Sequence, residues 1–209
     1  MVIEILNLLK EWQTLIGSIL GGIFALFVAL IVARSARRRE EISSGIIVIG
    51  NLVEIRSFSE AVMESVKKNN ISTQDLPLRY AEALVSTSPK LSPFFEASIS
   101  RIMSVDTDLA THLTLFLKIY QISQITLKKL SQDFEQLYKN KKPLRPENHF
   151  LEEAKRVTQQ FQLAVEHATC AERIISDRIL GCFPTWKRFR RFVFPNDQEK
   201  ECKKQLKNR

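Results

Sequence analysis

The side chains best suited to metal binding or nucleophilic catalysis in this chain are its three histidines and three cysteines. Asp108 and His112 are four residues apart, and His167 and Cys170 are three apart, so on a helix each pair would share a face. A zinc site needs four converging ligands, or three and a water. Neither pair has further ligands nearby in the sequence. We therefore expect a hydrogen bond along a helix, or ordinary packing, at both places.

Motifs of known reaction centres are absent from the sequence. The chain has no Glu-x-x-His of a di-iron bundle, no G-x-x-x-x-G-K-[ST] or G-x-G-x-x-G loop, and no G-x-S-x-G elbow. The serines are scattered and mostly flank expected turns and helix ends. We expect no catalytic residue, no cofactor and no metal, and a protein that is not an enzyme.

Cysteine usage bears on the redox compartment. Cys170, Cys182 and Cys202 lie far apart and form no C-x-x-C pair. An odd and sparse set argues against a disulfide framework. It is typical of a reducing compartment.

A second stretch with chemical character lies near the C-terminus, where aromatic and basic side chains interleave. No acidic residue occurs between Arg178 and Pro195. Aromatic side chains flanked by basic ones are typical of segments that bind an anionic membrane surface. The residues expected to make this contact are Trp186, Lys187, Arg188, Phe189, Arg190 and Arg191. The alternative is that the aromatic side chains close the domain core and the charges are merely solvated.

The element that would hold this segment at a membrane is residues 12–33. None of these 22 residues is charged, and twelve of them are Leu, Ile, Val or Phe. A helix of this length covers about 33 Å, slightly more than a bilayer core of roughly 30 Å. Trp12 stands at one end, as in an interfacial belt. Core helices seldom run this long without a charge, and a cleaved signal peptide would have a basic start and a shorter apolar run. We predict an uncleaved transmembrane anchor.

The charges around this span predict its orientation. Lys10 is the only basic side chain before the span, whereas a basic collar follows it, consisting of Arg34, Arg37, Arg38 and Arg39. Basic flanks stay in the cytoplasm, so we expect the N-terminus outside and the C-terminus inside, at the inner membrane of a bacterium. The chain after Ala33 holds 30 basic and 21 acidic residues, net +9. Anionic lipid headgroups are the expected partner of this charge. DNA or RNA is the less favoured alternative.

Small residues recur every four positions along the span. They form a ridge of Gly17, Gly21, Ala25, Ala29 and Ala33. The Gly17-x-x-x-Gly21 spacing lets two membrane helices pack closely. Gly and Ala are common in membrane helices anyway, but the unbroken ridge favours self-association through this helix.

The remaining chain has an all-α pattern, so we expect a transmembrane helix followed by a helical bundle or antiparallel helical hairpin, with coiled-coil-like spacing. Its expected parts are a short extracytoplasmic N-terminus (1–11), the span (12–33), a basic stop and juxtamembrane helix (34–70), a helical cytoplasmic domain (71–181), and an aromatic-basic segment with a charged tail (182–209).

Cap and turn residues predict the individual helices. The expected helices cover 36–68 (with a short strand at 45–49 as the alternative), 78–85, 94–103, 108–140 and 149–180. Ser92 and Asn148 are the expected N-caps of the third and the last of these, with Pro93 in a first helical position. Asp106 or Thr107 is expected to cap the fourth helix, and Gly181 to end the last.

The first forty residues resemble a loose group of small bacterial and phage single-pass membrane proteins. The shared features are W-x-x-L-x-G-x-x-x-G, here Trp12, Leu15, Gly17 and Gly21, then an Arg-rich stop and a helical cytoplasmic domain. The group has no assigned activity, so the resemblance implies a topology and no site residues.

These features together favour a non-catalytic, membrane-anchored helical module that recruits or regulates a protein partner at the cytoplasmic face. A membrane-perturbing protein of the toxin or holin kind is the alternative, based on the aromatic-basic segment and the glycine-lined span. A membrane-tethered module that binds nucleic acid is a second alternative, based on the net positive charge alone.

Overall fold

A computed structural model describes residues 2–68, 75–140, 147–181, 201–202 and 204–206. Within these ranges the chain forms helices and connecting turns with no strand, so the prediction of an all-α chain is confirmed. The elements are α1 (Val2–Lys68), α2 (Leu76–Thr87), α3 (Phe95–Ile102), η1 (Met103–Val105), α4 (Thr107–Asn140), α5 (Glu147–Ile175) and η2 (Ser176–Leu180). The chain divides into two compact units, Met1–Ile42 and Ser43–Arg209.

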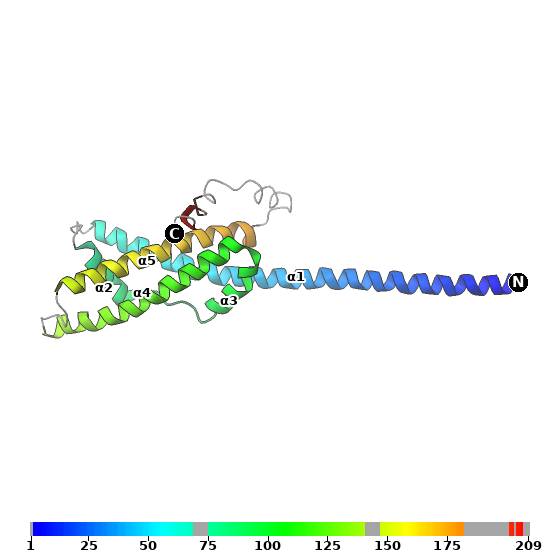
Figure 1. Cartoon of the computed structure of the whole chain (residues 1–209), viewed down its shortest axis with the longest axis horizontal. Coiled ribbons are helices and arrows are strands. Elements are labelled where there is room, and N and C mark those ends of the chain that lie inside the picture. The colour runs from blue at the N-terminus through cyan, green and yellow to red at the C-terminus, as the bar shows by residue number, and fades with distance from the viewer. Residues whose placement is uncertain (1, 69–74, 141–146, 182–200, 203, 207–209) are drawn as a thin grey trace. The chain divides into compact units, whose positions relative to one another are not determined.

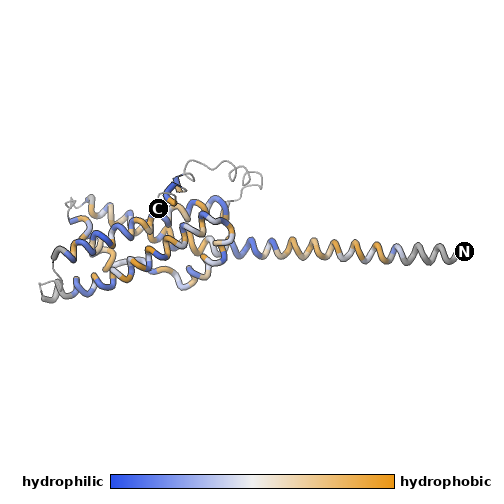
Figure 2. Tube along the Cα trace, viewed as in Figure 1, coloured by the Kyte–Doolittle hydropathy of each residue, from blue (hydrophilic) through white to orange (hydrophobic). Residues whose placement is uncertain are grey.

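The first unit consists of the first part of α1, which is one uninterrupted helix of 67 residues. Figure 2 shows its run of hydrophobic residues followed by a hydrophilic run. By length and composition α1 could cross a membrane. None of its most apolar stretch is buried against the rest of the protein. Residues 45–49, for which a strand was the alternative, are helical.

The second unit is built around α4 and α5, which lie side by side (Figure 1). At one end the rings of Phe134 and Phe150 are 5.1 Å apart, and towards the other end the rings of His112 and His167 are 5.2 Å apart. The late part of α4 thus meets the early part of α5, so the two helices run in opposite directions. Apolar side chains at helical spacing fill the space between them, because only one face of each helix is apolar.

The second part of α1 supplies another layer of this core. Leu52 is fully buried. Phe58 meets the edge of the Phe161 ring on α5, with centroids 6.1 Å apart. Arg56 Nη1 lies 2.8 Å from Glu172 Oε2, also on α5. Both apolar and ionic contacts therefore join α1 to α5.

Helix α2 covers this layer through a buried polar contact. The hydroxyls of Ser59 on α1 and Tyr80 on α2 are 2.6 Å apart. Tyr80 is fully buried, so the hydrogen bond meets the need of its phenol for a partner away from water. Helix α2 is longer than the predicted 78–85 because Pro77 is tolerated in its first turn.

The start of α3 corrects one predicted cap. Phe94, and not Ser92, is the N-cap. The Ser92 carbonyl accepts a hydrogen bond from the Phe95 N–H at 2.9 Å, which closes a turn one step before the helix begins. Asp106 does cap α4, because its Oδ1 accepts a hydrogen bond from the Leu109 N–H at 2.9 Å. That prediction is confirmed.

The two ends of α5 also differ from prediction. The helix begins at Glu147, so Asn148 lies in its first turn and is not the N-cap. The last turn widens into the π-helical η2, which periodicity did not predict. Gly181 follows η2 as predicted, but with φ −61° and ψ 124° it is extended and not left-handed. Arg178 in η2 forms an ion pair with Asp106, which links the end of α5 to the start of α4.

Candidate functional site

The small-residue ridge lies on an open surface of the first unit. A Cβ atom added at Gly17, Gly21 or Gly22 would meet nothing within 4 Å. Ala25 and Ala29 are exposed as well. The ridge therefore has room for the close approach of another helix, and self-association stays a prediction.

Large apolar side chains surround the ridge. Between Trp12 and Val32 their exposed fractions run from 44% at Val28 to 72% at Phe24. Twelve aliphatic or Phe side chains at about 1.5–3 kcal/mol each give a transfer free energy on the order of 20 kcal/mol or more for leaving water. Ser18 donates its hydroxyl hydrogen to the Leu15 carbonyl at 2.9 Å, so this polar group is satisfied within the helix.

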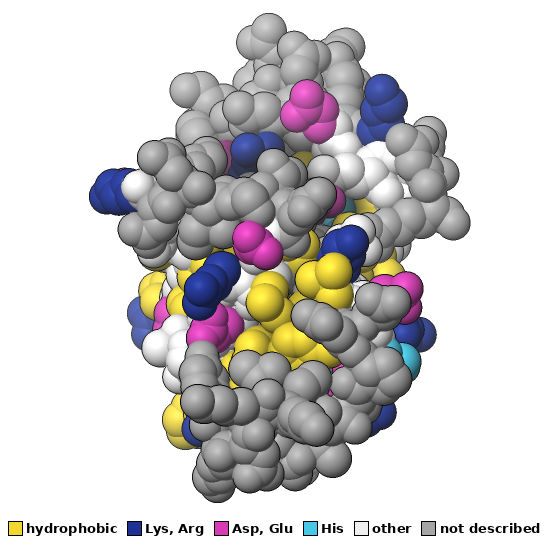
Figure 3. Space-filling view, turned by 90° about the vertical axis from the view of Figure 1, so that its left-hand side faces the viewer, with side chains coloured by type: hydrophobic (Ala, Val, Ile, Leu, Met, Phe, Trp, Pro, Cys, Tyr) yellow, Lys and Arg dark blue, Asp and Glu magenta, His cyan; other side chains and the backbone are white. Residues whose placement is uncertain are grey.

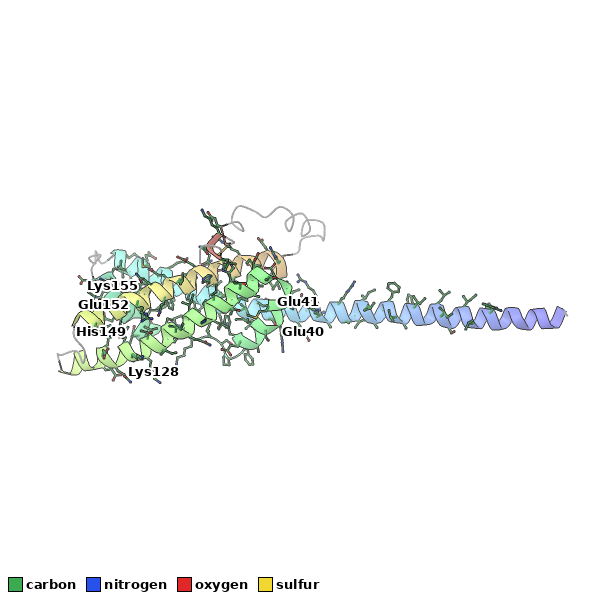
Figure 4. All side chains as sticks on the ribbon, viewed as in Figure 1. Glu40, Glu41, Lys128, His149, Glu152 and Lys155 are labelled. Carbon is green, nitrogen blue, oxygen red and sulfur yellow. A yellow bond between two sulfur atoms is a disulfide. The ribbon has the colours of Figure 1, made fainter. Side chains whose placement is uncertain are left out.

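The basic collar is partly paired with one carboxylate. Arg37 Nε lies 3.1 Å from Glu41 Oε1, and Arg38 Nη1 lies 3.5 Å from Glu41 Oε2. Figure 4 labels Glu41 on α1. The Arg37 side chain remains 68% exposed, and an exposed pair of this kind is worth only about 0–1 kcal/mol. Together with the exposed Arg34 and Arg39, the collar keeps a positive surface that suits anionic headgroups.

The predicted membrane-surface residues from Trp186 to Arg191 lie outside the described residues. Both alternatives for this segment therefore stay predictions.

A groove opens between α1 and α2 in the second unit. It has a volume of about 830 Å³. Its lining is Phe58, Ala61, Val62, Ser65, Val66, Arg79, Glu82, Ala83, Ser86 and Thr87. Figure 3 shows one end of the molecule, where hydrophobic side chains lie exposed among Lys, Arg, Asp and Glu. An apolar floor with a mixed polar rim is typical of a surface that receives another protein segment.

A second, more polar groove of about 610 Å³ lies between α2 and α4. Lys90 and Lys128 line it, together with hydroxyl and amide side chains such as Ser131. Lys128 is labelled on α4 in Figure 4. Neither groove was predicted from periodicity, because each is formed by side chains of two different helices.

Two histidines form a hydrogen bond in the core between α4 and α5. The Nδ1 atoms of His112 and His167 are 2.9 Å apart, and the side chains are 0% and 1% exposed. In this geometry one ring donates its N–H and the other accepts it. From the sequence we expected His112 to interact with Asp108 and His167 with Cys170, each on its own helix. The hydrogen bond between the two helices was not predicted. Among the described residues, no group of three or more His, Cys, Asp and Glu could hold a metal ion.

A disulfide corrects the expectation drawn from cysteine spacing. The Sγ atoms of Cys170 and Cys202 are 2.50 Å apart and the Cα atoms 5.8 Å apart, across 32 residues of sequence. Both side chains are 4% exposed. Sequence distance was misleading because the chain returns to α5 after η2. Closing a loop of this length stabilises a fold by about 3–4 kcal/mol in the chain-entropy account.

Two tyrosines have perturbed ionisation. Burial raises the pKa of Tyr80, and the hydrogen bond with Ser59 opposes this effect. Burial also raises the pKa of Tyr120, whose hydroxyl donates to the Pro89 carbonyl. The described residues contain no metal-binding cluster. Each phenol is hydrogen-bonded to another segment, Tyr80 to Ser59 and Tyr120 to Pro89, so both are best explained as polar anchors of the fold.

Comparison with known proteins gives no relative, since no family model matches the chain and neither the curated proteins nor the solved structures contain a detectable match.

Proposed function

We propose that this chain is a membrane-anchored, non-catalytic helical module that recruits or regulates a protein partner at the cytoplasmic face of a bacterial inner membrane. The observation that carries the proposal is that α1 supplies both an exposed apolar stretch long enough to span a bilayer and a buried layer of the helical domain. The helix that would lie in the membrane is therefore continuous in sequence with a core element of the domain.

The orientation follows from the basic collar. Arg34, Arg37, Arg38 and Arg39 stand directly after the apolar stretch, and one basic side chain precedes it. This asymmetry favours a cytoplasmic location for the second unit.

The groove between α1 and α2 supports a protein as the partner. An amphipathic helix presents apolar side chains on one face, and the apolar side chains of Phe58, Val62 and Ala83 offer a matching floor. At the rim, Arg79 and Glu82 form an ion pair with an N···O distance of 2.9 Å. Charged groups at a rim can fix the register of a bound helix and favour one partner over another.

The topology is tested with reporters fused after Arg209. A reporter active only in the cytoplasm should be active, and one active only outside should be silent. Replacing Arg34, Arg37, Arg38 and Arg39 with Glu should weaken or invert insertion, because these residues hold nearly all of the flanking charge asymmetry. The opposite reporter pattern in the native chain would refute the orientation. Recovery of the protein in the soluble fraction would refute the anchor.

The partner is tested by a photocrosslinking residue placed in the groove in native membranes. A crosslinker in place of Val62 should capture one discrete protein of another gene. The control carries the crosslinker in place of Thr111, which is exposed on α4 and lies outside the groove. Equal adduct patterns at both positions would argue against the groove. Growth arrest and dye leakage on expression would favour the membrane-perturbing alternative.

Contact of the aromatic-basic segment with lipid is tested on residues 43–209, which correspond to the second compact unit. This fragment should bind vesicles rich in anionic lipid and leave them as salt rises. Replacing Lys187, Arg188, Arg190 and Arg191 with Gln should abolish the salt-sensitive part, at about 1 kcal/mol for each charge. If Trp186→Ala with Phe189→Ala lowers the melting temperature and leaves lipid binding unchanged, the aromatic side chains belong to the core.

A further inference from the structure

We propose that Cys170 and Cys202 form a reversible, redox-sensitive clasp that fixes the C-terminal helical residues around Cys202 onto α5. This inference goes beyond the proposed function and does not depend on the identity of a partner. It starts from the pairing of a cysteine within α5 with one 32 residues later in the chain.

The backbone geometry suits bond formation without rearrangement. The Cα atoms are 5.8 Å apart, within the range of about 4.4–6.8 Å that disulfides occupy. The two thiols therefore do not have to be brought together by a change in the helices.

A hydrogen-bond acceptor for the reduced form lies beside the Cys170 sulfur. Cys170 Sγ lies 3.3 Å from the Oε1 atom of Gln205, a distance at which a thiol S–H donates a hydrogen bond. A disulfide has no hydrogen to donate, so this bond belongs to the dithiol state alone. Reduction would thus leave the Cys170 thiol with a hydrogen-bond acceptor within reach after the two sulfur atoms have moved apart from bonding distance.

Burial sets the route by which the pair reacts. Cys170 and Cys202 are each 4% exposed, so a small oxidant or reductant reaches the sulfur atoms only after the segment around Cys202 has separated from α5. Local opening of this kind costs less than global unfolding. The rate of thiol–disulfide exchange therefore depends on how often the residues around Cys202 separate from α5. The disulfide in turn makes this separation rarer.

The chemistry is thiol–disulfide exchange with a low-molecular-weight disulfide such as oxidised glutathione. The Cys202 thiolate attacks one sulfur of glutathione disulfide, forms a mixed disulfide and releases one glutathione thiolate. The Cys170 thiolate then attacks the Cys202 sulfur and releases the second glutathione. Two thiol protons pass to the solvent or to the leaving thiolates, and the two electrons lost by the cysteines reduce one glutathione disulfide.

The test uses the full chain in detergent micelles with Cys182→Ser, so that the pair contains the only cysteines. The protein is equilibrated at a series of reduced-to-oxidised glutathione ratios, and free thiols are then trapped with a mass-tagged maleimide. The two thiols should disappear together over one transition. Trypsin cleavage after the exposed Lys204 should be several-fold slower in the oxidised form, because proteases require an opened segment.

Matched variants separate the clasp from general packing. Cys170→Ser should remove the difference in cleavage between oxidising and reducing buffers. Gln205→Ala removes the hydrogen bond of the dithiol state, so it should shift the transition several-fold towards the disulfide. Peptide mapping of the native chain should find Cys170 joined to Cys202 and not to Cys182. Two tagged thiols at every ratio would overturn the proposal, as would a pair that stays oxidised at every ratio or equal cleavage in both states.

Discussion

A Cβ atom on Gly45 would lie 3.0 Å from Cγ2 of Ile179, which is closer than most contacts that real Cβ atoms make, so α1 and η2 are closely packed here. Ile175 Cγ2 would be only 3.2 Å from the same atom. Gly45→Val should therefore overpack this contact and destabilise the domain by about 1–3 kcal/mol. Thermal and denaturant unfolding of the full chain in detergent micelles, followed by circular dichroism, would measure the loss.

The matched control is Gly50→Val, five residues further along the same helix. A Cβ atom at Gly50 meets nothing within 4 Å. The change in helix propensity is the same at both positions, so the difference between the variants reports the contact alone. Equal melting temperatures would show that α1 and η2 are not closely packed.

The hydrogen bond between His112 and His167 predicts coupled effects of mutation. Each single replacement by Leu removes the partner of a buried Nδ1 atom and should cost about 1–3 kcal/mol. The double replacement removes both polar rings together, so its cost should be smaller than the sum of the two single costs. A double-mutant cycle in urea measures this difference. Strict additivity would mean that the two rings do not interact.

Tyr80 predicts a loss of stability at alkaline pH. Burial raises its pKa in the folded chain above the ordinary value of 10.0, so the unfolded chain loses the phenolic proton first. The corresponding stability is complete below pH 10 and is lost as pH rises through the higher pKa of the folded state. Tyr80→Phe should make the fall in melting temperature between pH 9 and pH 11 shallower. If an absorbance titration at 295 nm shows that Tyr80 of the folded chain ionises at its ordinary pKa, the predicted loss of stability is wrong.

The small-residue ridge predicts how mutations affect self-association. Gly21→Ile places a branched side chain where close helix packing needs a bare backbone, so the dimer signal in a membrane two-hybrid assay should fall. Leu20→Ile keeps the volume nearly constant at a position off the ridge and should change the signal little. Identical signals for the two variants would exclude the ridge as the contact surface.

Much of the fold follows from local patterns. The buried faces of α4 and α5 were predictable because residues such as Phe116 and Phe161 recur at helical spacing among polar ones. The Asp106 cap was predictable because its carboxylate reaches a backbone N–H three residues later. Both signals lie within one turn of the chain.

The cross-helix contacts could not be predicted in this way. Periodicity identifies the buried face of a helix but says nothing about which residue lies opposite on another helix. His112 and His167 are 55 residues apart, and their contact depends on the register of α4 against α5. The π-helical turn of η2, Ser176–Leu180, contains neither Gly nor Pro, so the sequence gives no local signal for a change in helix type.

The contact between Gly45 and Ile179 has a consequence for biosynthesis. These residues are separated by roughly 130 positions, so at about 5–20 residues per second a ribosome needs on the order of 10 seconds to supply the partner of Gly45. During that interval Phe58 on α1 has no Phe161 ring on α5 to pack against. The nascent domain thus exposes hydrophobic surface on α1 until nearly all of the bundle has been translated, and surface of this kind is prone to aggregation before the bundle closes.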